Sequence, residues 1–136
     1  AWGVGDRGQL DAALQQAHAA TAPCAIIVCR LDDLSQLAGK HPQRRVTRAV
    51  EQLALRLRLQ VRGVDSAYRV DERTVVVLLE ATDPEGAAAV QRRLADQARQ
   101  PVEVDRHALQ LSCGFSVHAL DGERTVEEVL REALPD

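Results

Sequence analysis

The sequence predicts an α+β domain of the palm (ferredoxin-like) type, in which helices flank a central mixed β-sheet. One observation is the apolar run CAIIVC at residues 24–29, which is typical of a strand buried on both faces. A second is the polar triplet 71–73 between two β-rich runs, which predicts a hairpin. The predicted order is helix, strand, two helices, two strands, helix, two strands, helix.

Two predicted helices flank the apolar run. Residues 6–20 place leucines and alanines at helical spacing behind an aspartate, a residue type that caps helices. After the run, Asp32 or Asp33 begins a short helix, which Gly39 and Pro42 end.

The pattern over residues 43–64 fits two structures. Alternating leucines suit a strand, whereas other apolar residues recur at steps of three and four. Length decides for a helix, because strands usually span only about five or six residues and the segment is rich in helix formers.

The second half of the chain is predicted from its turn and cap residues. Asp83 followed by proline and glutamate is a strong helix start. The predicted segments are the hairpin strands 68–70 and 74–79, a helix from 83 to 99, hairpin strands 102–104 and 108–117 across residues 105–107, and a helix at 126–134.

Composition excludes several classes of protein. The chain has 136 residues, 46% of them hydrophobic, and 17 basic against 20 acidic side chains give a net charge of −3. We therefore expect one domain, residues 1–136, that neither binds nucleic acid nor contacts a membrane directly. It starts at Ala1 and contains no methionine, so we expect a piece of a longer multidomain protein.

The cysteines and histidines do not predict a metal site. Cys24, Cys29 and Cys113 lie in apolar runs rather than in closely spaced pairs, which is typical of small core residues in a reducing compartment. The four histidines are scattered. We expect no metal and no cofactor.

Several segments together resemble the GGDEF-type diguanylate cyclase domain. Tyr-Arg-Val at 68–70, followed by residues 71–75 and the apolar run 76–79, is similar to the family's Arg-Tyr-GGDEF-apolar strand. Residues 3–7 are similar to its entry segment, and residues 111–115 to its Ser-Ile-Gly strand. The likeness spans nearly the whole chain and implies the fold predicted above.

The resemblance also implies that the signature is degenerate. The family joins two GTP molecules with the help of carboxylates that hold metal ions, and its glycines let the backbone approach the phosphates. The five signature positions here hold Asp71, Glu72, Arg73, Thr74 and Val75. The two glycines are replaced by acids, and the two acidic positions by an arginine and a threonine.

Counting back from the signature without a gap, the other positions that the family uses for catalysis also lack the required residue types. The strand-end metal carboxylate falls on Arg30, and the guanine-contacting residues fall on Ala38 and Thr47. A one-residue slip could let Asp71, Glu72 and Asp32 or Asp33 gather a metal, but the glycines would still be missing. The resemblance therefore implies a domain with no catalytic residues and no enzymatic activity.

A second site of the family has its counterpart here. The family's inhibitory site binds cyclic di-GMP through an RxxD motif five residues before the signature, and Arg62 and Asp65 match that motif and interval. The same register adds Arg93 from the following helix, with Arg92 beside it. A guanidinium pairs with guanine O6 and N7, and a carboxylate with its N1 and N2 hydrogens.

The leading hypothesis is an inactive GGDEF domain that acts as a cyclic di-GMP receptor in the bacterial cytoplasm and regulates attached domains. The resemblance implies that the ligand often binds as a stacked pair. Alternatively, Arg62 and Asp65 form an ordinary ion pair, and the chain is a nucleotide-independent module that docks a partner or forms a homodimer through its arginine-rich segment. Residual cyclase activity is the third hypothesis.

Overall fold

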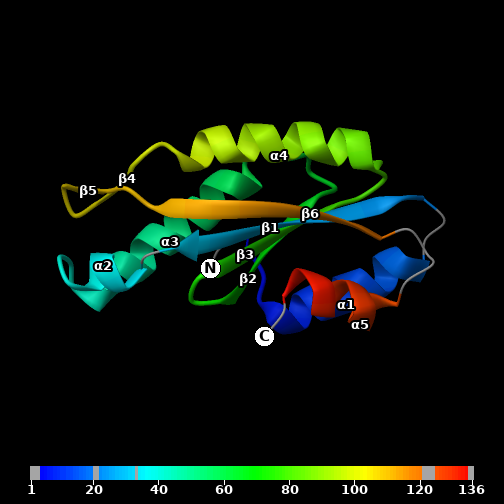
Figure 1. Cartoon of the computed structure of the whole chain (residues 1–136), viewed down its shortest axis with the longest axis horizontal. Helices are drawn as coiled ribbons and strands as arrows, with labels where there is room; N and C mark the ends of the chain where they lie inside the picture. Colours follow the sequence, from blue (N-terminus) through cyan, green and yellow to red (C-terminus); the bar gives the residue numbers. More distant parts are fainter. Residues whose placement is uncertain (1–3, 20–21, 33, 121–124, 135–136) are drawn as a thin grey trace.

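The computed structural model describes residues 4–19, 22–32, 34–120 and 125–134. A four-stranded sheet of order β2-β3-β1-β6 lies at its centre (Figure 1). The strands are β1 (Cys24–Asp32), β2 (Ser66–Asp71), β3 (Thr74–Leu79) and β6 (Ser112–Leu120), with β4 (Val102–Val104) and β5 (His107–Leu109) as a separate pair. The helices are α1 (Arg7–Ala19), α2 (Leu34–Ala38), α3 (Gln43–Arg58), α4 (Pro84–Ala98) and α5 (Val126–Ala133).

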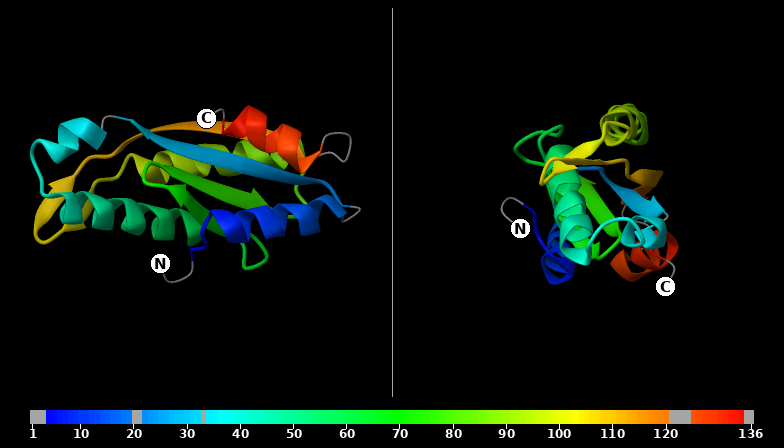
Figure 2. Two further views of the ribbon diagram at one scale, coloured as in Figure 1. Left: turned by 90° about the horizontal axis from the view of Figure 1, so that it is seen from below. Right: turned by 90° about the vertical axis from the view of Figure 1, so that its left-hand side faces the viewer.

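The sheet is buried on both faces, because helices cover each of them. Alternate residues of β1 point to opposite sides, so Ile27 belongs to the core beneath α3 and α4, whereas Ile26 belongs to the core beneath α1 and α5. The end-on view in Figure 2 shows the sheet between α4 and the pair α1 and α5. This sandwich explains why the 24–29 run is apolar at every position.

The fold class predicted from the sequence is confirmed. The apolar run forms a central strand, flanked by β3 and β6, and Asp83 caps α4 by accepting a hydrogen bond from the backbone N–H of Gly86. All pairs of named strands are antiparallel. Within the described residues, the parallel pairing is the isolated bridge from Gly5 to Tyr68, so the predicted mixed sheet is almost wholly antiparallel.

The prediction of a helix through residue 64 was wrong in its end point. The helix α3 ends at Arg58, and turns follow, with the backbone N–H of Asp65 donating to the carbonyl of Arg62. Of the later apolar residues at helical spacing, Val61 still packs against the core, whereas Val64 is 61% exposed. Arg62 and Asp65 therefore lie in a turn and not on a helix.

The predicted strand 108–117 is two strands in two different sheets. The residues Asp105 and Arg106 have positive φ angles of 51° and 67° and form the tight turn that pairs β4 with β5. The strand β6 then begins at Ser112 and pairs along β1. The two strands lie so close in sequence that the pattern showed no boundary between them.

Smaller boundaries also differ. Asp32 is the last residue of β1 rather than the start of a helix, α2 begins at Leu34, and Asp33 lies outside the described residues. Within the described segments, no helix has the length and apolar composition needed to cross a bilayer.

Candidate functional site: the altered hairpin and the Arg62 pocket

The altered signature occupies the hairpin between β2 and β3. Asp71 pairs with Thr74, which leaves Glu72 and Arg73 as the two turn residues. The Asp71 carboxylate accepts a hydrogen bond from the Arg73 backbone N–H, and the Arg73 carbonyl accepts one from the N–H of Leu31. The hairpin tip is thereby held against the end of β1, where the resemblance places the catalytic metal carboxylate.

Arg30 occupies that carboxylate position. It lies on β1 opposite Thr74 of β3 and opposite Gly114 of β6. Thr74 is fully buried. A guanidinium and a hydroxyl therefore stand where the resemblance implies two metal-binding carboxylates.

A cavity of about 260 Å³ lies between α2, α3 and the hairpin. Ala38, Thr47 and Glu72 all line it, so the structure brings together the positions that the resemblance assigns to guanine and to the signature. Ala38 offers a methyl group where the family uses an amide. The polar groups available to a ligand here include those of Gln43 and Arg69.

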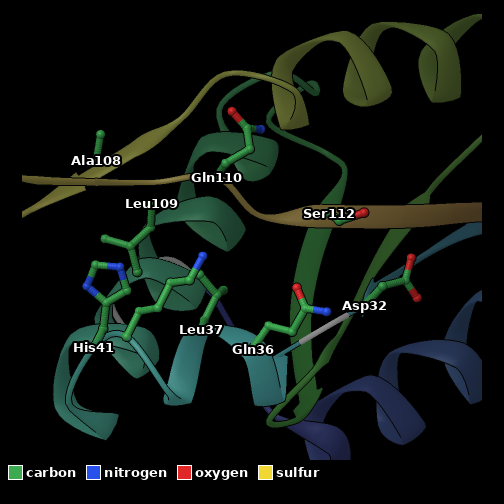
Figure 3. A pocket seen from close by; sticks show the side chains of 9 residues that line it. Asp32, Gln36, Leu37, His41, Ala108, Leu109, Gln110 and Ser112 are labelled. Carbon is green, nitrogen blue, oxygen red and sulfur yellow. The ribbon is translucent and has the colours of Figure 1, made fainter.

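Asp32 faces a different cavity. It lines a space of about 300 Å³ between α2 and the segment from β5 to β6, with Gln36 and Ser112 among its neighbours (Figure 3). Glu72 lines the hairpin cavity instead. In the described part of the chain, no three His, Cys, Asp or Glu side chains are grouped to hold a metal ion, and Asp33 lies outside that part.

Arg62 and Asp65 form a salt bridge between an exposed guanidinium and a buried carboxylate. The Arg62 Nε and Nη2 atoms donate to Oδ2 and Oδ1 of Asp65, each at 3.0 Å. The Asp65 side chain is 2% exposed and that of Arg62 is 55% exposed. The hydrogen bonds to Asp65 and the negative charge of Asp65 raise the pKa of Arg62, which therefore stays cationic.

The surrounding backbone completes this arrangement. The Asp65 carboxylate also accepts hydrogen bonds from the backbone N–H groups of Arg62 and Glu80, at 3.0 and 3.1 Å. Nη2 of Arg62 donates to the Glu80 carbonyl and to the hydroxyl of Thr82 at 2.9 Å. Asp65 thus joins the turn after α3 to the end of β3, and it fixes the direction of the arginine.

Arg93 lies on the other side of the same pocket. Its Nη2 donates to the Gln60 carbonyl at 2.8 Å, which ties α4 to the turn after α3. The pocket has a volume of about 470 Å³ and is lined by Arg62, Asp65, Leu79, Ala81, Thr82, Asp83, Gly86, Val90 and Arg93. Three of the four predicted ligand residues are therefore brought together, while Arg92 is exposed and does not line the pocket.

Two pocket residues were not predicted from the sequence. Thr82 supports Arg62, and Asp83 was interpreted only as the cap of α4, which it also is. Ala81 has a positive φ of 49°, which turns the chain sharply between β3 and α4. The pocket presents two guanidinium groups and is suited to an acceptor-rich anion, such as a phosphate or the O6 and N7 edge of guanine.

Comparison with known proteins identifies the family. Residues 7–134 match the family described as "Diguanylate cyclase, GGDEF domain". The chain belongs to the GGDEF domain family. Over 115 residues it is 25% identical to the bifunctional diguanylate cyclase/cyclic di-GMP phosphodiesterase MucR of Pseudomonas aeruginosa. That match covers 85% of this chain but only 17% of MucR, so the chain spans a small part of its relative's length.

Solved GGDEF structures share the fold. The FimX GGDEF domain from P. aeruginosa superposes with a TM-score of 0.84 at 24% identity, covering 96% of this chain and 85% of that one. The diguanylate cyclase SiaD of P. aeruginosa, solved in complex with its activator SiaC, gives a TM-score of 0.87 at 18% identity, covering 96% and 52%. At these identities the likeness establishes the fold alone.

Proposed function

We propose that this GGDEF domain does not synthesise cyclic di-GMP but binds it in the Arg62 pocket, as a cytoplasmic receptor domain of a longer protein. The observation that carries the proposal is the fixed Arg62, held by the buried carboxylate of Asp65, with Arg93 lining the same pocket. Binding would bridge Arg62 and Arg93, strengthen the link between the turn after α3 and α4, and so bias the attached domains.

The loss of synthesis follows from the charges at the hairpin. Joining the 3′-oxygen of one GTP to the α-phosphate of another requires metal ions, which activate the attacking oxygen and offset the developing charge. Arg30 and Thr74 cannot supply carboxylate oxygens to those ions. Asp71 and Glu72 replace the glycines and add negative charge beside the expected triphosphate position.

The match between pocket and ligand rests on the two arginines. Cyclic di-GMP has two phosphate charges and two guanine edges rich in acceptors, which guanidinium groups bind through charge-assisted hydrogen bonds. Arg62 is oriented before the ligand arrives, which lowers the entropic cost of binding. The Asp65 carboxylate already accepts four hydrogen bonds, so its main role here is to hold Arg62.

Thermal unfolding with and without cyclic di-GMP tests binding. A ligand present at a hundredfold excess over its dissociation constant adds about 2.7 kcal/mol to the free energy of unfolding and raises Tm accordingly. Arg93→Ala should reduce the shift, whereas Arg92→Ala, which removes the same charge from the neighbouring position on α4, should keep it. Equal shifts in both variants would contradict the assignment of Arg93.

Loss of synthesis is tested separately. The domain is incubated with GTP and Mg²⁺ or Mn²⁺, and the product is followed by chromatography. We expect no cyclic di-GMP. Accumulation of product above the level of a heat-denatured control would revive the cyclase hypothesis.

One observation favours a second candidate function, a nucleotide-independent interaction module. Leu59 and Val64 are exposed by 71% and 61% beside Arg62, and burying these two side chains against a partner would be favourable. Sedimentation analysis distinguishes the two functions. A dimer that forms without ligand, together with no thermal shift from cyclic di-GMP, would support the module.

A further inference from the structure

Two of the three cysteines, Cys29 on β1 and Cys113 on β6, lie on neighbouring strands and on the same face of the sheet. In the pairing of β1 with β6, Cys29 lies opposite Phe115 and Cys113 lies opposite Leu31. The thiols are therefore one diagonal step apart and point to the same face, where both belong to the core beneath α3 and α4. Cys24 belongs to the core on the other face.

The two thiols differ in their access to solvent. Cys29 is fully buried, whereas Cys113 is half-buried and lines a cavity of about 360 Å³ with Arg99 and Gln110. A small oxidant that enters this cavity meets the Cys113 sulfur first. Cys29 is within reach of that sulfur but does not line the cavity.

The pKa values of the two thiols are shifted in opposite directions. The Cys29 thiol hydrogen-bonds to the Cys113 sulfur, which lowers the pKa of Cys113 and raises that of Cys29. Partial burial and the charge of Asp32 oppose the lowering at Cys113. The thiolate is the reactive form, so the thiol that lines the cavity, Cys113, is also the one whose pKa is lowered.

We propose that Cys113 is a peroxide-reactive thiol and that Cys29 is its resolving partner, so that oxidation joins β1 to β6 through an intramolecular disulfide. The Cys113 thiolate attacks one oxygen of hydrogen peroxide; an S–O bond forms, the O–O bond breaks and hydroxide leaves, so sulfur is oxidised and peroxide reduced. The Cys29 thiol then attacks the sulfenic sulfur. An S–S bond forms, the S–O bond breaks, and the proton of Cys29 leaves with the hydroxyl group as water.

The position of β6 permits the movement that a disulfide needs. A diagonal pair of residues lies farther apart than a directly opposed pair, so the strands must approach each other locally. The strand β6 is at the edge of the order β2-β3-β1-β6 and pairs with β1 alone. It can therefore shift without disturbing a second set of strand hydrogen bonds.

Thiol titration of the native chain tests the proposal. After treatment with hydrogen peroxide and removal of the excess, we expect two of the three thiols to be lost and to return on reduction with dithiothreitol. Peptide mapping should show the Cys29 and Cys113 peptides joined, with the loss of two hydrogens. Cys24→Ser, the control on the opposite face, should show the same disulfide.

Two variants separate the roles of the thiols. Cys113→Ser should leave the remaining thiols unreacted on the same timescale. Cys29→Ala should stop the reaction at the sulfenic acid of Cys113, which dimedone traps. Three results would each overturn the proposal: retention of all thiols in the native wild-type chain, a disulfide that includes Cys24, or an unchanged rate of thiol loss in Cys113→Ser. Peptide mapping of the wild-type chain decides even if a variant fails to fold.

Discussion

Arg62 and Asp65 meet through two parallel hydrogen bonds, Nε to Oδ2 and Nη2 to Oδ1, each 3.0 Å long. One partner is buried and the other is more than half exposed. An exposed arginine normally samples many rotamers, but this one is held by a carboxylate that is itself bonded to the backbone. The turn after α3 therefore presents a guanidinium of fixed direction to the pocket.

Asp65→Asn should cost about 2 kcal/mol of unfolding free energy. The substitution keeps the shape of the side chain but removes the charge that accepts hydrogen bonds from the turn and from Arg62, and such charge-assisted bonds contribute about 1.5–3 kcal/mol. Denaturant unfolding gives the value. Asp96→Asn, whose ion pair with Arg99 is exposed on both sides, is the control and should change stability by less than about 0.5 kcal/mol.

Arg56→Ala should destabilise the domain by about 1 kcal/mol. Its guanidinium donates to the carbonyls of Gln97, Gln100 and Pro101, which satisfies acceptors at the carboxyl end of α4 from the neighbouring helix α3. Thermal unfolding measures the effect. Arg44→Ala removes an exposed arginine from the same helix and should leave Tm nearly unchanged; a similar loss in both variants would mean that the cap contributes nothing.

Gly5→Ala should destabilise the domain by about 2 kcal/mol. A Cβ at this position would lie 2.7 Å from Cδ2 of the buried Tyr68 ring, which would have to move. The strand-like contact made by Gly5, whose N–H donates to the Ala67 carbonyl at 2.9 Å, would be strained. Gly63→Ala meets no atom within 4 Å and should be close to neutral; equal stability of the two variants would refute this contact.

His41 should titrate below the ordinary histidine value of about 6.5. Partial burial lowers its pKa, as do the charge of Arg45 and the neighbouring His107. Its Nδ1 lies 3.1 Å from Nη1 of Arg45, so the ring accepts a hydrogen bond that protonation would remove.

The sign of the pH effect follows. The unfolded chain binds a proton to His41 more readily than the folded chain, so this residue lowers stability as the pH falls through the ordinary histidine value. NMR titration of the histidine ring measures the midpoint. Arg45→Ala should raise it and Arg44→Ala should not, whereas an ordinary midpoint in the wild-type chain would contradict the described environment.

The sequence predicted helices and strands well where a cap residue or a continuous apolar run marks them. Asp83 before Pro84 marked the start of α4, and the apolar run at 24–29 marked the central strand. The end of α3 was misjudged because helical spacing continues to Val64, although only tertiary contacts decide which apolar residues are buried. The division of 108–117 into β5 and β6 likewise depends on pairing with β1, a long-range contact.

The candidate site was predicted only in part. Spacing within a short segment, together with the family resemblance, singled out Arg62 and Asp65. The partnership of Arg62 with Thr82 and the Glu80 carbonyl depends on how β3 leaves the sheet, and no periodic signal encodes that. Arg92 and Arg93 could not be separated by sequence, because only the rotation of α4 decides which of two adjacent arginines lines the pocket.

Calorimetric titration with cyclic di-GMP tests the central claim most directly, using the wild-type chain and Arg62→Ala side by side. We expect saturable heat from the wild-type chain and an affinity lower by at least about tenfold in the variant, since charge-assisted hydrogen bonds contribute about 1.5–3 kcal/mol each. The absence of binding heat in the wild-type chain, or an equal affinity in a folded Arg62→Ala variant, would contradict the claim.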